Sequence, residues 1–253
     1  IAAERSAYDQ TAAAEGGWRG ARAFKLVQKQ AESAEITSFY LEPADGGAVI
    51  AHQPGQYIGL RVVVDGLEQR RNYSLSAPAN GKSYRISVKR EAGGKVSNHL
   101  HDQLHVGDTL ELFPPAGHFT LQANAKPLVL ISGGVGITPT LPMLQAALPT
   151  GREITFIHCA RDRGVHAFRE KIDALASRHE QLTRRYCYDQ ADAGDEVDAQ
   201  GLLSTERLAQ WLPESRDADV YFLGPRGFMR SVKQSLRELG VPEAQVHYEF
   251  FGP

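Results

Sequence analysis

A short glycine-rich turn constrains the fold of this chain more than any other feature. Residues 127–131 read Pro-Leu-Val-Leu-Ile, a continuous apolar run that is typical of a strand buried on both faces of a parallel sheet. Gly133, Gly134 and Gly136 follow, and glycine permits the tight, positive-φ turns that bring bare backbone close to a ligand. Thr138-Pro139 then predicts the cap and first residue of a helix. Such a helix start favours an anion, and a nucleotide pyrophosphate is the natural candidate.

The spacing of this turn is Gly-Gly-x-Gly-x-Thr-Pro. It matches neither the dinucleotide motif Gly-x-Gly-x-x-Gly nor a Walker loop with its lysine, so both motifs are disfavoured. A strand-to-helix turn that binds nothing remains open on this motif alone. The residues predicted to contact a nucleotide here are Gly133, Gly134, Val135, Gly136, Ile137 and Thr138.

Length and charge limit the classes of protein that fit. A chain of 253 residues with 42% hydrophobic content can form two domains of ordinary size. The net charge of −2 shows no basic excess, which argues against nucleic acid or an anionic membrane surface as a partner. No apolar stretch approaches the roughly 20 residues that span a bilayer, and no signal peptide is recognisable. These observations favour a cytoplasmic protein that acts on small molecules.

Neither cysteines nor histidines show the spacing of a metal site. Cys159 and Cys187 occur in apolar, strand-like contexts and are predicted to be buried free thiols. His99, His101 and His105 occur in a helical region without a neighbouring carboxylate motif, which predicts a solvated helix face.

Two patterns of secondary structure follow one another along the chain. The first is a series of short strands separated by turn residues, with one helix near 96–103, and it predicts a small closed barrel. The second alternates strands with helices and predicts a doubly wound parallel sheet. The barrel strands are expected at 24–27, 36–41, 57–64, 72–75, 84–88 and 109–113. The later strands are expected at 128–131, 154–159, 183–188, 220–223 and 246–250, with helices at 141–148, 166–177, 205–211 and 228–239. The predicted domains are 21–124 and 125–253.

A second group of functional residues is predicted in the barrel. Arg71-Asn72-Tyr73-Ser74 combines a cation, an aromatic ring and a hydroxyl on one strand, suited to a phosphate, a planar ring and a ring nitrogen. Alternation sends Tyr73 to one side of the strand and Asn72 and Ser74 to the other. An ordinary barrel strand is the alternative interpretation. Glu91–Ser97 then places a glycine turn before a helix, giving a second candidate anion site. Two such sites imply two nucleotides.

Taken in order, these motifs resemble those of the ferredoxin reductase-type flavoprotein family, and most closely the reductase half of bacterial flavohaemoglobins, which are nitric oxide dioxygenases. The resemblance covers essentially the whole chain. The matching segments are Pro54-Gly55-Gln56-Tyr57, Arg71-x-Tyr73-Ser74, Gly93-Gly94-Lys95-Val96-Ser97, Gly133 to Pro139, Gly224-Pro225-x-Gly227-Phe228-Met229 and Tyr248-Glu249-Phe250-Phe251-Gly252-Pro253.

The resemblance implies FAD in the barrel domain and NADH or NADPH, with NADH favoured, on the parallel sheet. Arg71 and Ser97 would hold the FAD pyrophosphate, Tyr73 would lie against the isoalloxazine, and Ser74 would hydrogen-bond its N5 edge. The remaining residues implied to contact cofactor are Tyr57, Asn72, Phe250, Phe251, Gly252 and Pro253. Glu249 is implied to influence the flavin potential, which makes Ser74, Tyr73 and Glu249 the predicted catalytic group.

Two features leave the chemistry partly open. The family usually has Cys where this chain has Leu223, so placement of the nicotinamide is in doubt here. Arg161 and Arg163 suit a 2′-phosphate, whereas Asp162 suits a bare ribose, so the residues leave the coenzyme undecided.

The N-terminal segment resembles the junction between globin and reductase in this family, which makes residues 1–20 the expected end of a globin helix plus linker. An ordinary N-terminal helix packed on this chain is the alternative. Haem would then belong only to that globin domain, the expected partner, and the parent reaction would be nitric oxide detoxification to nitrate. One alternative is a stand-alone reductase for a separate oxygenase or electron carrier. Another is a non-catalytic nucleotide-binding subunit, with Leu223 as its main support.

Overall fold

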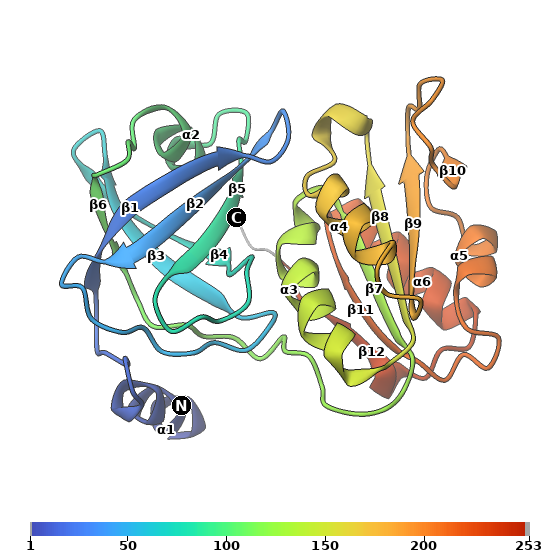
Figure 1. Cartoon of the computed structure of the whole chain (residues 1–253), viewed down its shortest axis with the longest axis horizontal. Coiled ribbons are helices and arrows are strands. Elements are labelled where there is room, and N and C mark those ends of the chain that lie inside the picture. The colour runs from blue at the N-terminus through green and yellow to red at the C-terminus, as the bar shows by residue number, and fades with distance from the viewer. Residues whose placement is uncertain (1, 251–253) are drawn as a thin grey trace. The chain divides into compact units, whose positions relative to one another are not determined.

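The structure is a computed structural model that describes residues 2–250, and it divides into two compact units (Figure 1). The barrel unit comprises residues 2–31 and 35–120, and the sheet unit comprises residues 32–34 and 121–250. The main division falls between Thr120 and Leu121. Each unit is described by itself below.

The barrel unit is built on one antiparallel sheet with the strand order β4-β3-β6-β1-β2-β5. A bridge between Leu75 and Ile86 joins the end of β4 to β5, so the sheet closes on itself. The strands are β1 (Arg22–Ala31), β2 (Ile36–Pro43), β3 (Tyr57–Val64), β4 (Leu67–Ser74), β5 (Tyr84–Lys89) and β6 (Thr109–Leu112). This arrangement confirms the predicted six-stranded barrel.

Alternating apolar residues fill the barrel interior, as the period of two in a strand requires. Ile58 and Leu60 of β3 are fully buried, and they share one core cluster with Phe24 and Phe39. Helix α2 (Lys95–Asp102) contributes Leu100 and Val96 to the same cluster. The helix thereby places its N-terminus beside the barrel.

Strand β4 begins earlier than predicted, at Leu67 instead of residue 72. Asp65 and Gly66 both have positive φ, 52° and 75°, which is the geometry of a two-residue type I′ hairpin turn. Asp-Gly is a strong sequence signal for this turn, so the sequence does contain the signal for an earlier start of β4. That start was not predicted because the residues after the turn are polar.

The segment before β1 forms helix α1 (Ala2–Ala13) and a connection to the barrel. Trp18 is buried, and its indole Nε1 donates a hydrogen bond to the carbonyl of Leu112 at 3.1 Å. The backbone N–H of Gly20 donates to the hydroxyl of Tyr8 at 2.8 Å. These contacts fix the connection against β6 and tie it to α1.

The sheet unit contains one parallel sheet with the order β10-β9-β8-β7-β11-β12. In Figure 1, α3 and α4 cover one face, and α5 and α6 cover the other. The strands are β7 (Leu128–Gly133), β8 (Ile154–Ala160), β9 (Leu182–Tyr188), β10 (Ala199–Gln200), β11 (Asp219–Leu223) and β12 (Val246–Tyr248). The helices are α3 (Ile137–Ala147), α4 (Arg169–Ala176), α5 (Thr205–Trp211) and α6 (Arg226–Glu238), with short 3-10 turns at η1 (Gly134–Gly136), η2 (Leu148–Thr150), η3 (Arg163–Val165) and η4 (Glu243–Gln245). This confirms the predicted doubly wound domain.

The order of strands reverses between β7 and β11. The chain runs outward from β7 through β8, β9 and β10, and then crosses back to place β11 on the other side of β7. In doubly wound folds, ligands bind in the crevice that this switch point creates at the carboxyl ends of the strands. Gly133 ends β7 and Leu223 ends β11, so the glycine turn lies at the switch point.

The prediction for the three histidines is wrong for His101. Helix α2 ends at Asp102, so His105 lies beyond it. His101 is half-buried, with Nε2 2.8 Å from the Val88 carbonyl oxygen, and its ring therefore holds α2 against β5. Across residues 2–250, no helix combines the length and the apolar character needed to cross a membrane.

Candidate nucleotide-binding sites

The turn before α3, Gly133–Thr138 (the α3 turn), turns directly from strand into helix. Gly133 is extended, Gly134 has φ of +52°, and residues 134–136 form a 3-10 turn that leads into α3 at Ile137. The helix therefore starts before Thr138, and the prediction of Thr138 as its cap is wrong. The Thr138 hydroxyl donates to the Val135 carbonyl at 3.0 Å. No side chain caps the start of the 3-10 turn or of α3.

The glycines of this turn serve two different purposes. A Cβ on Gly136 would lie 2.1 Å from the Leu223 carbonyl oxygen, and one on Gly133 would lie 3.0 Å from the Phe228 ring. These two glycines allow the loops after β7 and β11 to pack together. Gly134 differs, because a Cβ there would meet nothing within 4 Å. Its open side and its positive φ leave space for a ligand.

The electrostatics of the α3 turn suit an anion. The first turn of α3 holds no acidic residue, and its leading amide groups have no side-chain partner. Gly134 and Val135 are half-buried, whereas Ile137 and Thr138 are buried. Contacts from the buried members of the predicted set would therefore come from backbone. These features fit the pyrophosphate of a dinucleotide.

The candidate flavin residues of the barrel unit lie on the β3–β4 pair. Ser74 is opposite Tyr57, and Asn72 is opposite Gly59. Residues directly opposite in an antiparallel pair share a face, so Tyr57, Asn72 and Ser74 lie on one face of the sheet. Tyr73 lies on the other face and packs against the barrel core. Burial raises the pKa of Tyr73 to about 12, which keeps its hydroxyl neutral.

Within the described residues, β4 pairs with β3 along one side, and the bridge to β5 is made beyond its end, at Leu75. A flat group placed along the other side of β4 would be within reach of side chains from both faces. Arg71 is exposed, and its guanidinium donates to the carbonyl of Arg70 at 2.7 Å. This arrangement leaves most guanidinium N–H groups of Arg71 available to a phosphate.

The turn before α2, Glu91–Ser97 (the α2 turn), is held together by Ser97. The Ser97 Oγ accepts the N–H of Glu91 at 3.2 Å and donates to the Gly94 carbonyl at 3.3 Å. Ser97 is itself buried, and α2 begins without a side-chain cap or an acidic residue in its first turn. Gly93 has φ of +72°, and a Cβ there would meet nothing within 4 Å. The turn suits an anion, with Ser97 shaping it from within.

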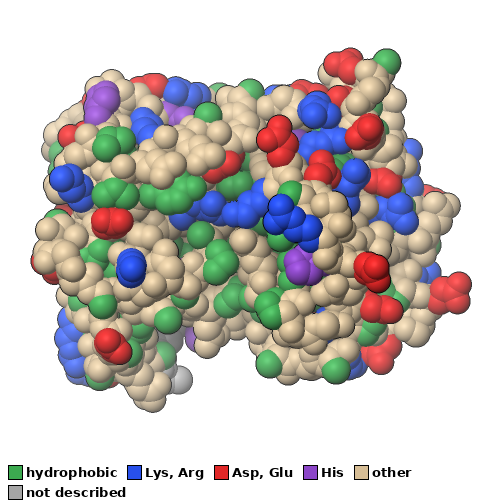
Figure 2. Space-filling model, in the orientation of Figure 1, with side chains coloured by type: hydrophobic (Ala, Val, Ile, Leu, Met, Phe, Trp, Pro, Cys, Tyr) green, Lys and Arg blue, Asp and Glu red, His purple; other side chains and the backbone are tan. Residues whose placement is uncertain are grey.

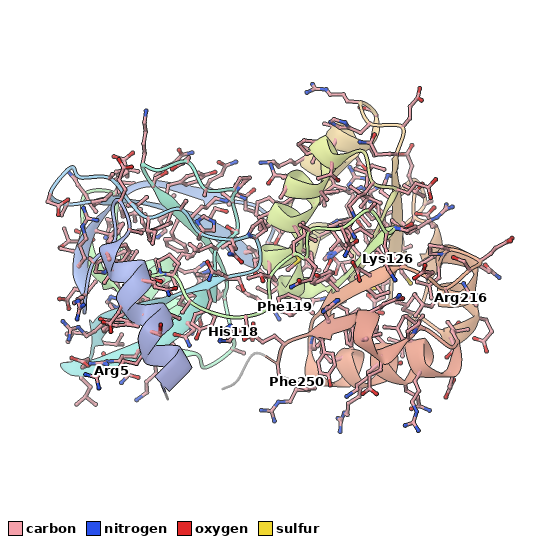
Figure 3. The ribbon with its side chains drawn as sticks, turned by 90° about the horizontal axis from the view of Figure 1, so that it is seen from below. Arg5, His118, Phe119, Lys126, Arg216 and Phe250 are labelled. Carbon is pink, nitrogen blue, oxygen red and sulfur yellow. The ribbon has the colours of Figure 1, made fainter. Side chains whose placement is uncertain are left out.

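The chain end carries a stack of aromatic rings. Tyr248 stacks on Phe222, with ring centroids 5.1 Å apart, and Phe250 meets Tyr248 edge-on at 5.6 Å. Lys233 donates to the Tyr248 hydroxyl. Phe250, labelled in Figure 3, is 52% exposed, and Glu249 is half-buried. The predicted contacts at Phe251, Gly252 and Pro253 lie outside the described residues.

Asp162, one of the residues that bears on coenzyme choice, is engaged within its own loop. Its Oδ1 accepts the N–H of Val165 at 3.3 Å, and its Oδ2 accepts from Arg161 Nε at 3.3 Å. The carboxylate therefore caps η3.

Leu223 is fully buried at the end of β11, so its side chain belongs to the core of the sheet unit. Basic and acidic side chains both occur over the surface shown in Figure 2.

Comparisons with known proteins also divide the chain into two nucleotide-binding domains. Residues 23–121 match the model of the oxidoreductase FAD-binding domain, and residues 130–234 match that of the oxidoreductase NAD-binding domain. The chain is 66% identical over its full length to a flavohemoprotein of Pseudomonas putida, and it spans 64% of that protein's length.

Two solved structures extend the comparison. The flavohem-like FAD/NAD-binding domain of nitric oxide dioxygenase from Vibrio cholerae is 40% identical, with a TM-score of 0.84, and the match covers 92% of this chain and 99% of that one. The flavohemoglobin of Malassezia yamatoensis, with bound FAD and heme, is 28% identical, with a TM-score of 0.87. That match covers 100% of this chain and 64% of that one.

The barrel, the doubly wound sheet and the two matching domain models define the class: an NAD(P)H-dependent flavin oxidoreductase. Within that class, the chain belongs to the flavohaemoprotein family, of which it forms the FAD- and NAD-binding reductase portion.

Proposed function

We propose that this chain takes hydride from NADH, in preference to NADPH, and delivers single electrons to the haem of a globin domain in the whole protein. FAD, when bound, supplies the conversion of two-electron into one-electron chemistry. The activity of the whole protein would be oxidation of nitric oxide to nitrate. Because reduced pyridine nucleotides are intracellular substrates, we place this activity in the cytoplasm.

The observation that best supports the proposal is the pair of anion-ready helix starts, one in each unit. Each combines an uncapped helix N-terminus, a first turn free of acidic residues and a glycine with positive φ whose open side admits a ligand. One such turn is common, but one per unit is what a reductase with two nucleotides requires. The α3 turn also lies at the switch point of its sheet.

The chain's own residues would do three kinds of work. Arg71 would pair with a pyrophosphate, where a guanidinium offers bidentate hydrogen bonds. Tyr73 would exclude water from one side of the bound ring. Ser74 would exchange a hydrogen bond at the flavin N5 edge, because a hydroxyl can donate or accept as that atom changes protonation. Further contacts are assigned to Tyr57, Asn72, Ser97, Glu249, Phe250, Phe251, Gly252 and Pro253, and to the α3 turn for the hydride donor.

We further propose that residues 1–20 are the end of a globin helix and its linker, with domains at 21–124 and 125–253. The chain's 64% share of the Pseudomonas putida flavohemoprotein supports this placement, as does the single helix α1 joined to the barrel through Trp18. The chain's own globin domain would then be the partner that receives electrons.

Anaerobic mixing of the FAD-loaded chain with NADH and, separately, with NADPH tests the proposal. We expect the flavin absorption band to bleach, faster with NADH, and ferricyanide to be reduced as a one-electron acceptor. Arg71→Ala should lower flavin content, whereas Arg70→Ala on the same strand should not. Binding of NADH without bleaching would instead favour a non-catalytic nucleotide-binding subunit.

A further inference from the structure

The only two cysteines of the chain are side by side in the sheet unit. Cys159 of β8 is the register partner of Cys187 of β9, so the two side chains project from the same face of adjacent parallel strands. Neighbouring strands run about 4.8 Å apart, which lies within the Cα separations that a disulfide spans. Both cysteines are free thiols in the structure.

The surroundings of the pair give the two thiols different pKa values and different exposure. Arg207 of α5 places Nη1 3.9 Å from the Cys187 Sγ. The hydrogen bond from Cys159 and the charge of Arg207 lower the pKa of Cys187, and the same hydrogen bond raises the pKa of Cys159. Cys187 is buried and its thiol donates to the Gly201 carbonyl at 3.0 Å, whereas Cys159 is half-buried. The neighbouring guanidinium and the lowered pKa make Cys187 the candidate attacking thiol and Cys159 its resolving partner.

We propose that Cys159 and Cys187 form a redox-sensitive pair that peroxide closes to a disulfide, and that the closed form binds the pyridine nucleotide more weakly. The Cys187 thiolate attacks one oxygen of hydrogen peroxide, breaking the O–O bond, to give a sulfenic acid and hydroxide. The Cys159 sulfur then attacks the Cys187 sulfur and forms the S–S bond, and the sulfenic oxygen leaves as water with the Cys159 proton. Two thiol sulfurs are oxidised, and one peroxide is reduced.

Closing this bond would move the ends of two strands. Neighbouring strands run about 4.8 Å apart, whereas a disulfide brings the two Cβ atoms to about 3.5–4.5 Å. The strand ends must therefore approach one another, and the resulting strain makes the bond easy to reduce. The bridge is thus suited to reversible control.

The loops that follow the two strands would carry the movement onward. The N–H of Asp189 donates to the Ala160 carbonyl at 3.0 Å, and that of Gln190 donates to the Arg161 carbonyl at 2.8 Å. These loops continue the carboxyl ends of β8 and β9, the side of a doubly wound sheet on which nucleotides bind. The predicted effect on the nucleotide rests on the proposed function, whereas disulfide formation does not.

The experiment treats the FAD-loaded chain with hydrogen peroxide and maps its peptides without reduction. We expect one linked peptide that joins Cys159 to Cys187, with two hydrogen atoms lost. The KM for NADH in ferricyanide reduction should rise about fivefold, a factor equal to about 1 kcal/mol of binding, while kcat changes little. Dithiothreitol should reverse both changes. After peroxide treatment, Cys159→Ser and Cys187→Ser should each keep the KM of the untreated chain. Arg207→Gln should slow formation of the disulfide.

Three results would overturn parts of this proposal. Absence of the linked peptide, or oxidation of one cysteine to a sulfinic acid without linkage, would exclude the pair. Linkage with an unchanged KM would exclude the effect on nucleotide binding. Failure of the untreated chain to oxidise NADH would contradict the proposed function instead, and the peptide map would still decide whether the pair closes.

Discussion

The two glycine turns that precede α2 and α3 look alike in sequence, yet the structure uses their glycines differently. In the α2 turn, the Cβ of an alanine at Gly94 would lie 2.5 Å from the Ser97 Oγ and 3.0 Å from the Glu91 Cβ, both of which belong to the turn itself. In the α3 turn, an alanine at Gly136 would meet the Leu223 carbonyl at 2.1 Å, which is backbone of a neighbouring strand. The α2 turn is a local structure, whereas the α3 turn is part of the packing of its sheet.

This difference shows that a glycine-rich phosphate motif combines two separate requirements. Gly136 and Gly133 are required by the protein's own packing, whether or not a ligand binds. Gly93 and Gly134 have a positive φ, which favours glycine, and a Cβ at either position would meet nothing within 4 Å. They are therefore the positions at which a ligand can approach bare backbone. Only the second kind carries direct information about nucleotide binding. The predictions below separate the two requirements.

Gly136→Ala should give the largest effect. The new methyl group cannot be accommodated without moving β11 or the start of α3, so the sheet unit should lose about 3 kcal/mol or more of stability and its NADH binding. The barrel unit should keep both its stability and its FAD. The chain has two tryptophans, Trp18 in the barrel unit and Trp211 in the sheet unit. Urea unfolding followed by fluorescence in Trp18→Phe and Trp211→Phe backgrounds reports each unit separately.

Gly227→Ala is the matched control for this substitution. Gly227 lies in the first turn of α6, has no positive φ, and a Cβ there would meet nothing within 4 Å. Alanine should therefore leave the stability of the sheet unit unchanged or raise it slightly, since it restricts the unfolded chain. An equal loss of stability in both variants would contradict the packing role assigned to Gly136.

Arg71→Ala should weaken FAD binding without unfolding the barrel. Loss of charge-assisted hydrogen bonds to a pyrophosphate costs about 2 kcal/mol, or roughly a thirtyfold rise in the dissociation constant. The side chain is exposed and bonds only a neighbouring carbonyl among the contacts described, so the free energy of unfolding without FAD should stay within about 0.5 kcal/mol. Fluorescence titration of the apoprotein measures the affinity.

Arg70→Ala controls for the loss of a cation from the same strand. Arg70 pairs with Glu68 and lies over the Phe113 ring, so its guanidinium is already engaged within the protein. FAD affinity should be the same in this variant as in the parent chain. Equal weakening in both variants would show that general positive charge, and not Arg71 itself, holds the flavin nucleotide.

Acid should unfold the sheet unit before the barrel unit. His158 is fully buried, and burial lowers its pKa to about 3, so its protonation favours the unfolded state. The stability that neutral His158 contributes is fully present above its ordinary pKa of 6.5 and is lost progressively as the pH falls towards 3. The loss at pH 5 is about 2 kcal/mol. The pKa of its neighbour His166 is also lowered, chiefly by burial.

The barrel unit should respond less, because hydrogen bonds to the carbonyls of Ala77 and Val88 favour the charged forms of His52 and His101 and partly offset their burial. Unfolding of the two single-tryptophan variants at pH 7 and pH 5 measures the difference. A loss of stability of the same size in both units would contradict this assignment.

The sequence predicted the elements well wherever periodicity and local turn chemistry agreed. Strand β3 and helix α5 have the predicted bounds, because the first half of β3 alternates between half-buried and buried residues and Ser204 caps α5. The start of α3 was misplaced because Thr138 resembles a cap, although the positive φ of Gly134 starts the turn earlier. Strand β10 was missed because it is two residues long.

The site was predictable as a set of motifs and unpredictable as a set of contacts. Strand alternation correctly separated Tyr73 from Asn72 and Ser74. Nothing local in the sequence indicates that Gly136 packs on Leu223, because that contact depends on β11 crossing back beside β7. The register of Cys159 with Cys187 depends likewise on how β8 and β9 align.

Gly93→Ala and Gly134→Ala should produce the smallest effects on stability and the most direct test of the comparison. Each forces alanine into positive φ with nothing within 4 Å, so each should cost its unit about 1 kcal/mol. Gly81→Ala and Gly151→Ala are matched controls, with φ of +72° and +74° and equally open surroundings outside the candidate sites. If the open glycines admit nucleotides, Gly93→Ala should weaken FAD and Gly134→Ala should weaken NADH, while the controls lose stability alone. Equal nucleotide affinities in variants and controls would mean that both turns are structural.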